Sequence, residues 1–306
     1  MGDTTIAWTD KTWNPTTGCS KVSQGCKNCY AERIFHRPYP GRKFTDVRCH
    51  PERLDQPLHW RKPCRIFVNS MSDLFHEDIP QTFIAKVFEV MNEAHQHTFQ
   101  VLTKRPARML KMLSDRVWPW ATTIDKQPQP NVWLGVSVED QATADERIPL
   151  LLKTPAAVHF VSYEPALGPV DFSAYLPMER TCICDRKKSS YTKDNPYCKW
   201  PHGKTLLNQI IVGGESGPKA RTFDVEWARS TIEQCKAAGV ACFLKQLGSY
   251  PISQSDGIAP SYLSVHGDEV FLSRGQRSLD WSRLKHPAGA DPSEWPEDLR
   301  VRDFPE

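Results

Sequence analysis

The chain reads Arg65-Ile66-Phe67-Val68-Asn69-Ser70-Met71-Ser72-Asp73 in its first quarter: an apolar run of strand length that ends in a cluster of polar residues. Five later runs have the same character, namely Phe99–Leu102, Val132–Val136, Val158–Val161, Gln209–Val212 and Ala241–Leu244. Such near-continuous apolar strands are typical of a parallel sheet that is buried on both faces. The sequence therefore predicts six parallel strands with polar residues gathered at their carboxyl ends.

Segments of helical length separate these runs. Two of them, Gln81–His97 and Phe223–Ala238, carry apolar residues at helical spacing. Strands that alternate with helices indicate βαβ units and an α/β fold built on a parallel sheet or barrel. In barrels of this kind the active site lies at the carboxyl ends of the strands.

Length and composition set outer bounds on the protein. Its 306 residues suit about two domains or one α/β barrel. A hydrophobic content of 39% and a charged content of 25% are those of a globular chain. No apolar run approaches the roughly 18 residues of a membrane-spanning helix, and the first residues lack a secretion signal. We therefore expect a cytoplasmic protein without membrane contact, whose net charge of +3 neither indicates nor excludes a nucleic-acid partner.

Three of the ten cysteines, Cys19, Cys26 and Cys29, form a C-x6-C-x2-C motif. In a reducing compartment such spacing points to metal chemistry before disulfides. Soft thiolates suit zinc or an iron–sulfur cluster. Structural zinc takes four ligands, and a fourth could come from His36, Cys49 or His50. Three cysteines without a clear fourth favour a 4Fe–4S cluster with one iron left open.

A second set lies in a segment, Pro177–Lys204, that interrupts the strand order. Cys182, Cys184, Cys198 and His202 give C-x-C-x13-C-x3-H, which suits a closed structural zinc site (Zn2+). An auxiliary iron–sulfur cluster is the alternative. The segment also carries lysines interleaved with aromatic residues, a pattern that suits either nucleic-acid contact or a solvated loop held by zinc.

The first cysteine motif resembles that of the radical S-adenosylmethionine (radical SAM) superfamily. The usual spacing there is C-x3-C-x2-C, and the aromatic residue before the last cysteine is replaced here by Asn28, with Tyr30 following instead. The resemblance implies a partial (β/α) barrel, TIM-barrel-like, with a 4Fe–4S cluster on Cys19, Cys26 and Cys29. We expect Tyr30 to contribute to the cofactor site.

Residues after the next strands are similar to the spore photoproduct lyase family. Ser72-Asp73, Thr103-Lys104 and Ser137 match positions that hold the methionine moiety of S-adenosyl-L-methionine in that family. The resemblance implies cofactor binding by Ser72, Asp73, Lys104 and Ser137. An acid suits the ammonium group of methionine, and a lysine with a hydroxyl suits its carboxylate.

Along most of residues 4–250 the chain resembles the phage Gp37/Gp68 family of uncharacterised proteins. The matching segments are Trp8–Asp10, Trp13–Cys19, Asn69–Phe75, Leu102–Pro106, Trp133–Glu139 and Gly213–Gly217. This resemblance implies a phage protein and brings no established substrate.

Together the resemblances imply a radical SAM enzyme, a lyase or a nucleic-acid-modifying enzyme. It would cleave S-adenosylmethionine reductively to a 5′-deoxyadenosyl radical that abstracts hydrogen from a nucleic acid or nucleotide. An electron donor such as flavodoxin or ferredoxin is then an expected partner. The alternatives are a non-catalytic zinc protein that binds nucleic acid through both cysteine clusters, and a barrel that uses its cluster without radical chemistry.

Polar residues at the predicted barrel mouth complete the candidate site. Tyr163, Glu164 and Glu215 are the catalytic candidates, with Tyr163 either a hydrogen-atom relay or a structural residue. Charged residues at the mouth could instead form ion pairs that cap the barrel. The expected division is a barrel over residues 1–250, interrupted by a metal-binding insertion at 177–204, and an irregular C-terminal appendage at 251–306.

Overall fold

The computed structural model describes residues 4–114, 128–177, 206–253, 264–266, 269–271 and 284–305. The predicted zinc set of Cys182, Cys184, Cys198 and His202 lies outside the described residues.

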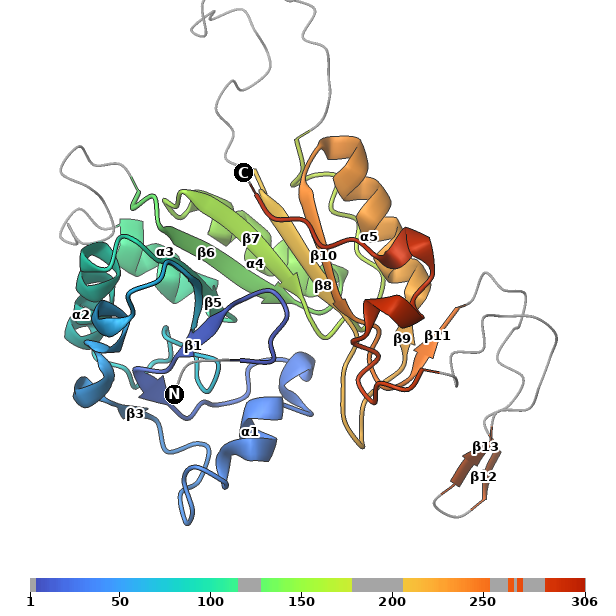
Figure 1. Ribbon diagram of the computed structural model, residues 1–306, viewed down its shortest axis with the longest axis horizontal. Helices are drawn as coiled ribbons and strands as arrows, with labels where there is room; N and C mark the ends of the chain where they lie inside the picture. Colours follow the sequence, from blue (N-terminus) through green and yellow to red (C-terminus); the bar gives the residue numbers. More distant parts are fainter. Residues whose placement is uncertain are drawn as a thin grey trace, which may run out of the picture.

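A seven-stranded parallel sheet with the order β1-β4-β5-β6-β7-β8-β10 forms the centre of the molecule. It curls into a half-barrel, so the predicted partial (β/α) barrel is confirmed (Figure 1). The strands are β1 (Lys11–Trp13), β4 (Arg65–Val68), β5 (Thr98–Thr103), β6 (Val132–Val138), β7 (Val158–Tyr163), β8 (Gln209–Gly213) and β10 (Ala241–Gln246). The larger helices are α2 (Gln81–Glu93), α3 (Pro106–Ser114), α4 (Gln141–Lys153) and α5 (Val225–Ala238).

All six strands expected from the apolar runs are present, and each is parallel to its neighbours. The seventh strand, β1, is not among the six apolar runs. It has three residues and pairs with β4 from Lys11↔Ile66 to Trp13↔Val68. So short a segment has no periodicity of its own. The burial of Trp13 determines which face of β1 points into the core.

Two apolar layers hold the sheet. The larger core lies between the sheet and the helices and includes Val68, Val161 and Val212. A smaller inner cluster on the opposite face contains Trp8, Phe67, Phe160, Ile211 and Phe243. Adjacent strand residues alternate between the layers because successive side chains point to opposite faces. The inner cluster fills the interior of the half-barrel, and polar residues lie at the carboxyl ends of the strands.

Short strands and helices complete the fold, with the 3-10 helices labelled η. Near the N-terminus they are β2 (Thr16–Thr17), which pairs with β3 (Arg48–Cys49), η1 (Gln24–Cys26), α1 (Tyr30–Phe35), η2 (Pro51–Arg53) and η3 (Gln56–His59). Farther on, β9 (Phe223–Asp224) pairs with β11 (Pro251–Ile252), and β12 (Ser264–His266) pairs with β13 (Glu269–Phe271). The last two elements are the 3-10 helices η7 (Pro292–Glu294) and η8 (Glu297–Leu299).

The described C-terminal residues run along the outer edge of β10. Leu244 N–H donates to the carbonyl of Val301 at 2.9 Å, and Asp303 N–H donates to that of Cys242 at 2.8 Å. Trp295 packs into the larger core. These contacts cover an edge strand that would otherwise present unpaired backbone groups.

No helix within the described ranges is long and apolar enough to cross a membrane.

Candidate functional site

The three cysteines of the first motif, here called the Cys triad, lie on residues 18–29, here called the Cys loop. The loop leaves β2 through Gly18, whose φ of +89° favours glycine. A Cβ atom on Gly18 would lie only 2.6 Å from the carbonyl oxygen of Asp46. Cys19 N–H donates to the Phe44 carbonyl at 2.9 Å, so backbone contacts fix the first cysteine of the triad.

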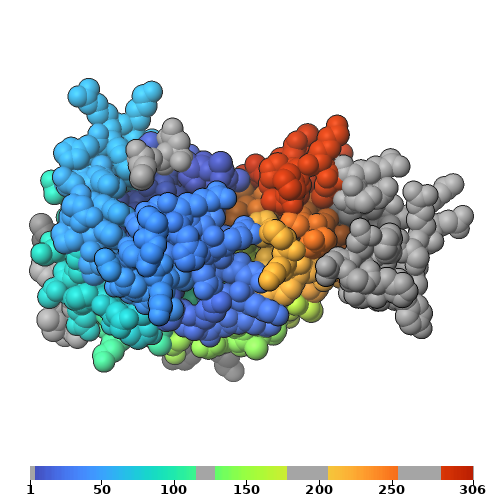
Figure 2. Space-filling model, turned by 90° about the horizontal axis from the view of Figure 1, so that it is seen from below, coloured from blue at the N-terminus to red at the C-terminus, as the bar shows by residue number. Residues whose placement is uncertain are grey.

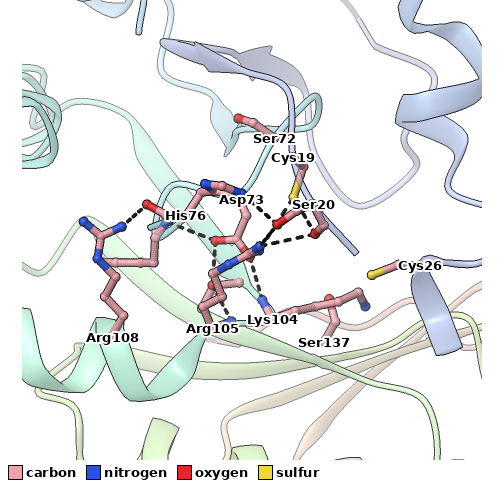
Figure 3. A network of polar contacts seen from close by, with 12 residues as sticks. Cys19, Ser20, Cys26, Ser72, Asp73, His76, Lys104, Arg105, Arg108 and Ser137 are labelled. Atoms are coloured by element: carbon pink, nitrogen blue, oxygen red, sulfur yellow. Dashed lines mark hydrogen bonds and ion pairs between the residues drawn. The ribbon is translucent and has the colours of Figure 1, made fainter. Parts of the chain in front are cut away.

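Arg105 joins the Cys loop to the ends of β4 and β5 (Figure 3). Its Nη1 lies 3.6 Å from the Sγ atom of Cys19 and 3.3 Å from Oδ2 of Asp73. Its Nη2 donates to the hydroxyl of Ser20 at 2.8 Å. Arg105 is buried, and from the sequence it was expected only among the charged residues at the barrel mouth, directly after Lys104.

Asp73 is buried beside this arginine and uses both carboxylate oxygens. Oδ1 accepts from the Thr103 hydroxyl at 2.7 Å, and Oδ2 accepts from Lys104 N–H at 2.9 Å. Asp73 therefore orders the end of β5 as well as facing the Cys loop. Next to it, the Ser72 hydroxyl contacts the Thr16 hydroxyl at 2.7 Å, which places Ser72 beside the start of the loop.

Glu139, at the end of β6, is fully buried and acts as an anchor for the Cys loop. Its Oε1 accepts from the Ser23 hydroxyl at 3.1 Å and from Nζ of Lys104 at 2.6 Å. Nη1 of Arg147 lies 3.2 Å from both carboxylate oxygens. Ser137 is buried two residues earlier on the same strand, and its carbonyl accepts from Arg147 at 2.8 Å. Lys104 and Ser137 thus share one end of the half-barrel.

Glu215 is a second anchor, after β8. Its Oε2 accepts from the Asn28 amide at 2.9 Å, and its Oε1 lies 2.7 Å from Nη2 of Arg221. Burial acts to raise the pKa of Glu215, but the hydrogen bonds from Arg221 and Asn28 outweigh it and hold that pKa below its usual value. Because Asn28 lies between Cys26 and Cys29, Glu215 positions the second half of the triad.

Tyr30 and Glu164 lie close enough that the charge of the Glu164 carboxylate acts on the Tyr30 phenol. The Tyr30 side chain is partly exposed, but its hydroxyl is enclosed and donates to the Ser70 carbonyl at 2.6 Å. Desolvation of this hydroxyl, with the charges of Cys29 and Glu164, raises the pKa of the phenol. Glu164 pairs with Nζ of Lys245 at 3.0 Å, across β8. Gly213 leaves room for that contact, because a Cβ there would lie 2.8 Å from Oε1 of Glu164.

Tyr163 lies elsewhere. Its side chain is in the larger core, on the helix-covered side of the sheet, where it packs edge-on against Phe172. Its hydroxyl donates to the Gly168 carbonyl. This packing is that of the structural residue, one of the two roles considered for Tyr163 from the sequence.

The thiols of the triad are electrostatically coupled. Burial, followed by the charge of Asp73, raises the pKa of Cys19 to about 11, and burial also raises the pKa of Cys29. The charge of Cys26 contributes to both shifts. A positively charged group bound by the three sulfurs would relieve this repulsion, because metal ligands bind as thiolates.

The thiols of the Cys triad are the candidate ligands for a metal group. Each cysteine in the described ranges is a free thiol. No three His, Cys, Asp or Glu side chains in those ranges are arranged to hold a metal ion as they stand. In kind and number, however, three partly buried thiols on one glycine-flanked loop suit a thiolate-bound iron–sulfur cluster.

Comparison with known families gives a match over residues 3–285 to DUF5131, described as a protein of unknown function. The chain belongs to the DUF5131 family. The match does not confirm the phage Gp37/Gp68 name, and no curated protein matches this DUF5131 chain. Among solved structures, a Cys-to-Ser mutant of spore photoproduct lyase is similar, with a TM-score of 0.40 and 15% sequence identity. That likeness covers 54% of this chain and 48% of the lyase, so the chain matches about half of the lyase's length.

Proposed function

We propose that this DUF5131 chain is a radical SAM-type iron–sulfur enzyme. The observation that carries the proposal is the contact of Arg105 with both Cys19 and Asp73, because it joins the Cys loop to the strand ends where cofactor residues were predicted. The confirmed half-barrel supports it, since active sites of such folds lie at the carboxyl ends of the strands. The Cys-triad resemblance supplies the reaction class.

In this proposal Cys19, Cys26 and Cys29 hold a 4Fe–4S cluster. When bound, the cluster supplies an electron for reductive cleavage of S-adenosylmethionine to methionine and a 5′-deoxyadenosyl radical, which abstracts hydrogen from the substrate. The protein positions and shields the reacting groups. The electron would come from a partner such as flavodoxin or ferredoxin.

Four side chains would bind the methionine part of S-adenosylmethionine. Ser72 and Asp73 suit its ammonium group, and Lys104 and Ser137 suit its carboxylate. The internal bonds of Asp73 give it a second task, which is to hold Lys104 and Arg105 in place. Tyr30, directly after Cys29, would border the cofactor from the Cys loop.

Two glutamates are proposed to face the substrate. Glu164, paired with Lys245, and Glu215, which anchors the Cys loop, would face the substrate, for which a nucleic acid or nucleotide is proposed. Residues 1–250 would form the barrel unit, 177–204 a zinc-binding insertion and 251–306 an appendage, in a phage-related protein that acts in the cytoplasm.

Anaerobic reconstitution tests the proposal. Iron, sulfide and zinc are counted in the purified chain, and 5′-deoxyadenosine is measured after adding dithionite and S-adenosylmethionine. For the wild type we expect about four irons per chain, beyond any in the insertion, and formation of 5′-deoxyadenosine. Each of the variants C19A, C26A and C29A should lose both these irons and 5′-deoxyadenosine formation. Cys64→Ala is the matched control, because Cys64 is a half-buried free thiol at the opposite end of β4.

Two results would contradict the proposal. Zinc held by the Cys triad, without iron uptake or cofactor cleavage, would instead support the non-catalytic zinc protein. A cluster that depends on the triad but never cleaves S-adenosylmethionine would support a barrel without radical chemistry.

A further inference from the structure

The positive charge of the chain is concentrated around the Cys loop. Residues 21–48 hold seven Lys and Arg and two Asp and Glu, a formal charge of +5, whereas the whole chain carries +3. The other residues together are therefore slightly acidic. This segment includes most of the Cys loop, α1 and the turn that follows it.

Both acidic residues of the segment are already paired. Glu32 lies 2.9 Å from Nζ of Lys21, and Asp46 lies 2.6 Å from Arg48 and 3.4 Å from Arg42. The other four cations of the segment are exposed and have no acidic partner in the described part of the chain: Lys27, Arg33, Arg37 and Lys43.

Lys219 extends the positive surface across a second segment. It is exposed, and its carbonyl accepts from the Asn28 amide at 2.7 Å. Nearby, Arg33 donates to the Ser216 carbonyl at 3.4 Å. In Figure 2 the N-terminal segment in blue and the segment near residue 220 in yellow lie side by side on one face. We call Lys27, Arg33, Arg37, Lys43 and Lys219 the basic rim.

Exposed apolar side chains gather beside the basic rim. The large hydrophobic residues that stand out as exposed in the described ranges are Val22, Tyr30 and Tyr250, with exposed fractions of 44%, 42% and 50%. Val22 lies in the Cys loop and Tyr30 directly follows it. Tyr250 follows Ser249, whose N–H donates to the Glu215 carbonyl at 2.9 Å. Two tyrosines are thus partly open to solvent: Tyr30 lies on α1 with Arg33, and Tyr250 lies on the segment that contacts Glu215.

We infer that the basic rim, with Tyr30 and Tyr250, binds a single-stranded nucleic acid. Unpaired Lys and Arg side chains attract the phosphate backbone, and exposed aromatic rings stack on bases that are free of a duplex. An acidic protein would satisfy the cations but would leave the tyrosines without a stacking partner. The surface does not require the cluster, and it gives the proposed nucleic-acid substrate a place to bind at the Cys loop.

Fluorescence anisotropy with the purified full chain tests this inference. The probes are a labelled 12-nucleotide single-stranded DNA, the RNA of the same sequence, and the corresponding duplex, each titrated between 50 and 200 mM salt. We expect a single strand to bind more tightly than the duplex, and the preferred sugar identifies DNA or RNA. Polyglutamate serves as a competitor that carries charge without bases.

The variant R33Q/R37Q/K43Q removes three rim charges without touching the Cys triad. We expect binding to weaken at least tenfold at low salt. Each phosphate contact on a single strand contributes about 0.7 to the slope of log K against log salt, so loss of three contacts should make that slope shallower by about 2. The matched control is R61Q/K62Q/K236Q, which removes three exposed cations elsewhere and should bind like the wild type. Tyr250→Ala should weaken binding to the single strand by about 5- to 100-fold.

The inference is overturned if the rim variant and the control bind equally, if an abasic strand or polyglutamate binds as well as the normal strand, or if no strand binds at 50 mM salt. Competition by polyglutamate at equal charge would point to an acidic protein partner instead. Because anisotropy needs neither iron nor S-adenosylmethionine, failure here removes the proposed nucleic-acid surface but does not bear on the proposed cluster or on cleavage of S-adenosylmethionine. Failure of cofactor cleavage likewise leaves this surface untouched.

Discussion

Gly25 of the Cys loop packs against the buried carboxylate of Glu139 so closely that a Cβ atom would lie 2.4 Å from Oε1. The carboxylate cannot easily move away, because Lys104 and Arg147 hold it from the barrel side. The position of Cys26, the next residue, is therefore set by the end of β6.

We expect Gly25→Ala to destabilise the fold by about 1–3 kcal/mol, as overpacking at a close contact does. The free energy of unfolding from urea titrations measures the effect, and the iron content of reconstituted protein should fall with it. Gly168→Ala is the control, since its Cβ would meet only Asp140 Cβ at 3.7 Å. Equal stability of the two variants would show that the Cys loop is not held by Glu139.

Replacement of Glu139 by alanine should cost about 3–5 kcal/mol, because removing one partner of a buried ion pair leaves the other charge uncompensated. Arg147 is nearly as buried as Glu139, at 3% side-chain exposure. Chemical unfolding of E139A measures the loss. The exposed Glu146 on α4 offers a control, and E146A should stay within about 0.5 kcal/mol of the wild type. A small effect of E139A would mean that water solvates the remaining cations.

Glu215 should make stability depend on pH in the acidic range. Its pKa lies below the usual 4.5 in the fold, so the folded state binds its proton less readily than the unfolded chain. Its contribution is fully present above pH 4.5 and is lost as the pH falls through the folded pKa. The difference in unfolding free energy between wild type and E215Q, measured from pH 7 to pH 3, should therefore shrink below pH 4.5. A constant difference would contradict the ionic role of Glu215.

Asp140 begins α4 and also contacts the Cys loop. Its carboxylate accepts from Thr143 N–H at 2.9 Å and from the Gln24 amide at 2.6 Å. We expect Asp140→Ala to lower stability by about 0.5–2 kcal/mol through loss of the helix cap. Asp140→Asn, which keeps an acceptor oxygen, should lose less. If Q24A and D140A are strictly additive in a double-mutant cycle, the loop contact contributes nothing.

Much of the fold could be predicted from local patterns. The run from Arg65 to Val68 is a strand with those same bounds, and the five later runs lie within strands of the same sheet. Helix α2 ends at Glu93, before the predicted His97, because His97 turns inward and contacts the Pro57 carbonyl at 3.1 Å. No apolar run marks the bounds of strand β1, because three residues carry no period and its pairing with β4 joins segments 55 residues apart.

The βα rhythm, the Cys triad and the polar residues after each strand can all be read from the chain, because periodicity and spacing are local properties. Which of those residues meet depends on the folded structure. Arg105 reaches Cys19 across 86 positions of sequence, and Asn28 reaches Glu215 across 187. The fold likewise turns Tyr163 into the core and Glu164 towards Lys245. Such pairings depend on the curl of the sheet, which brings the strand ends around one loop and cannot be read from any single segment.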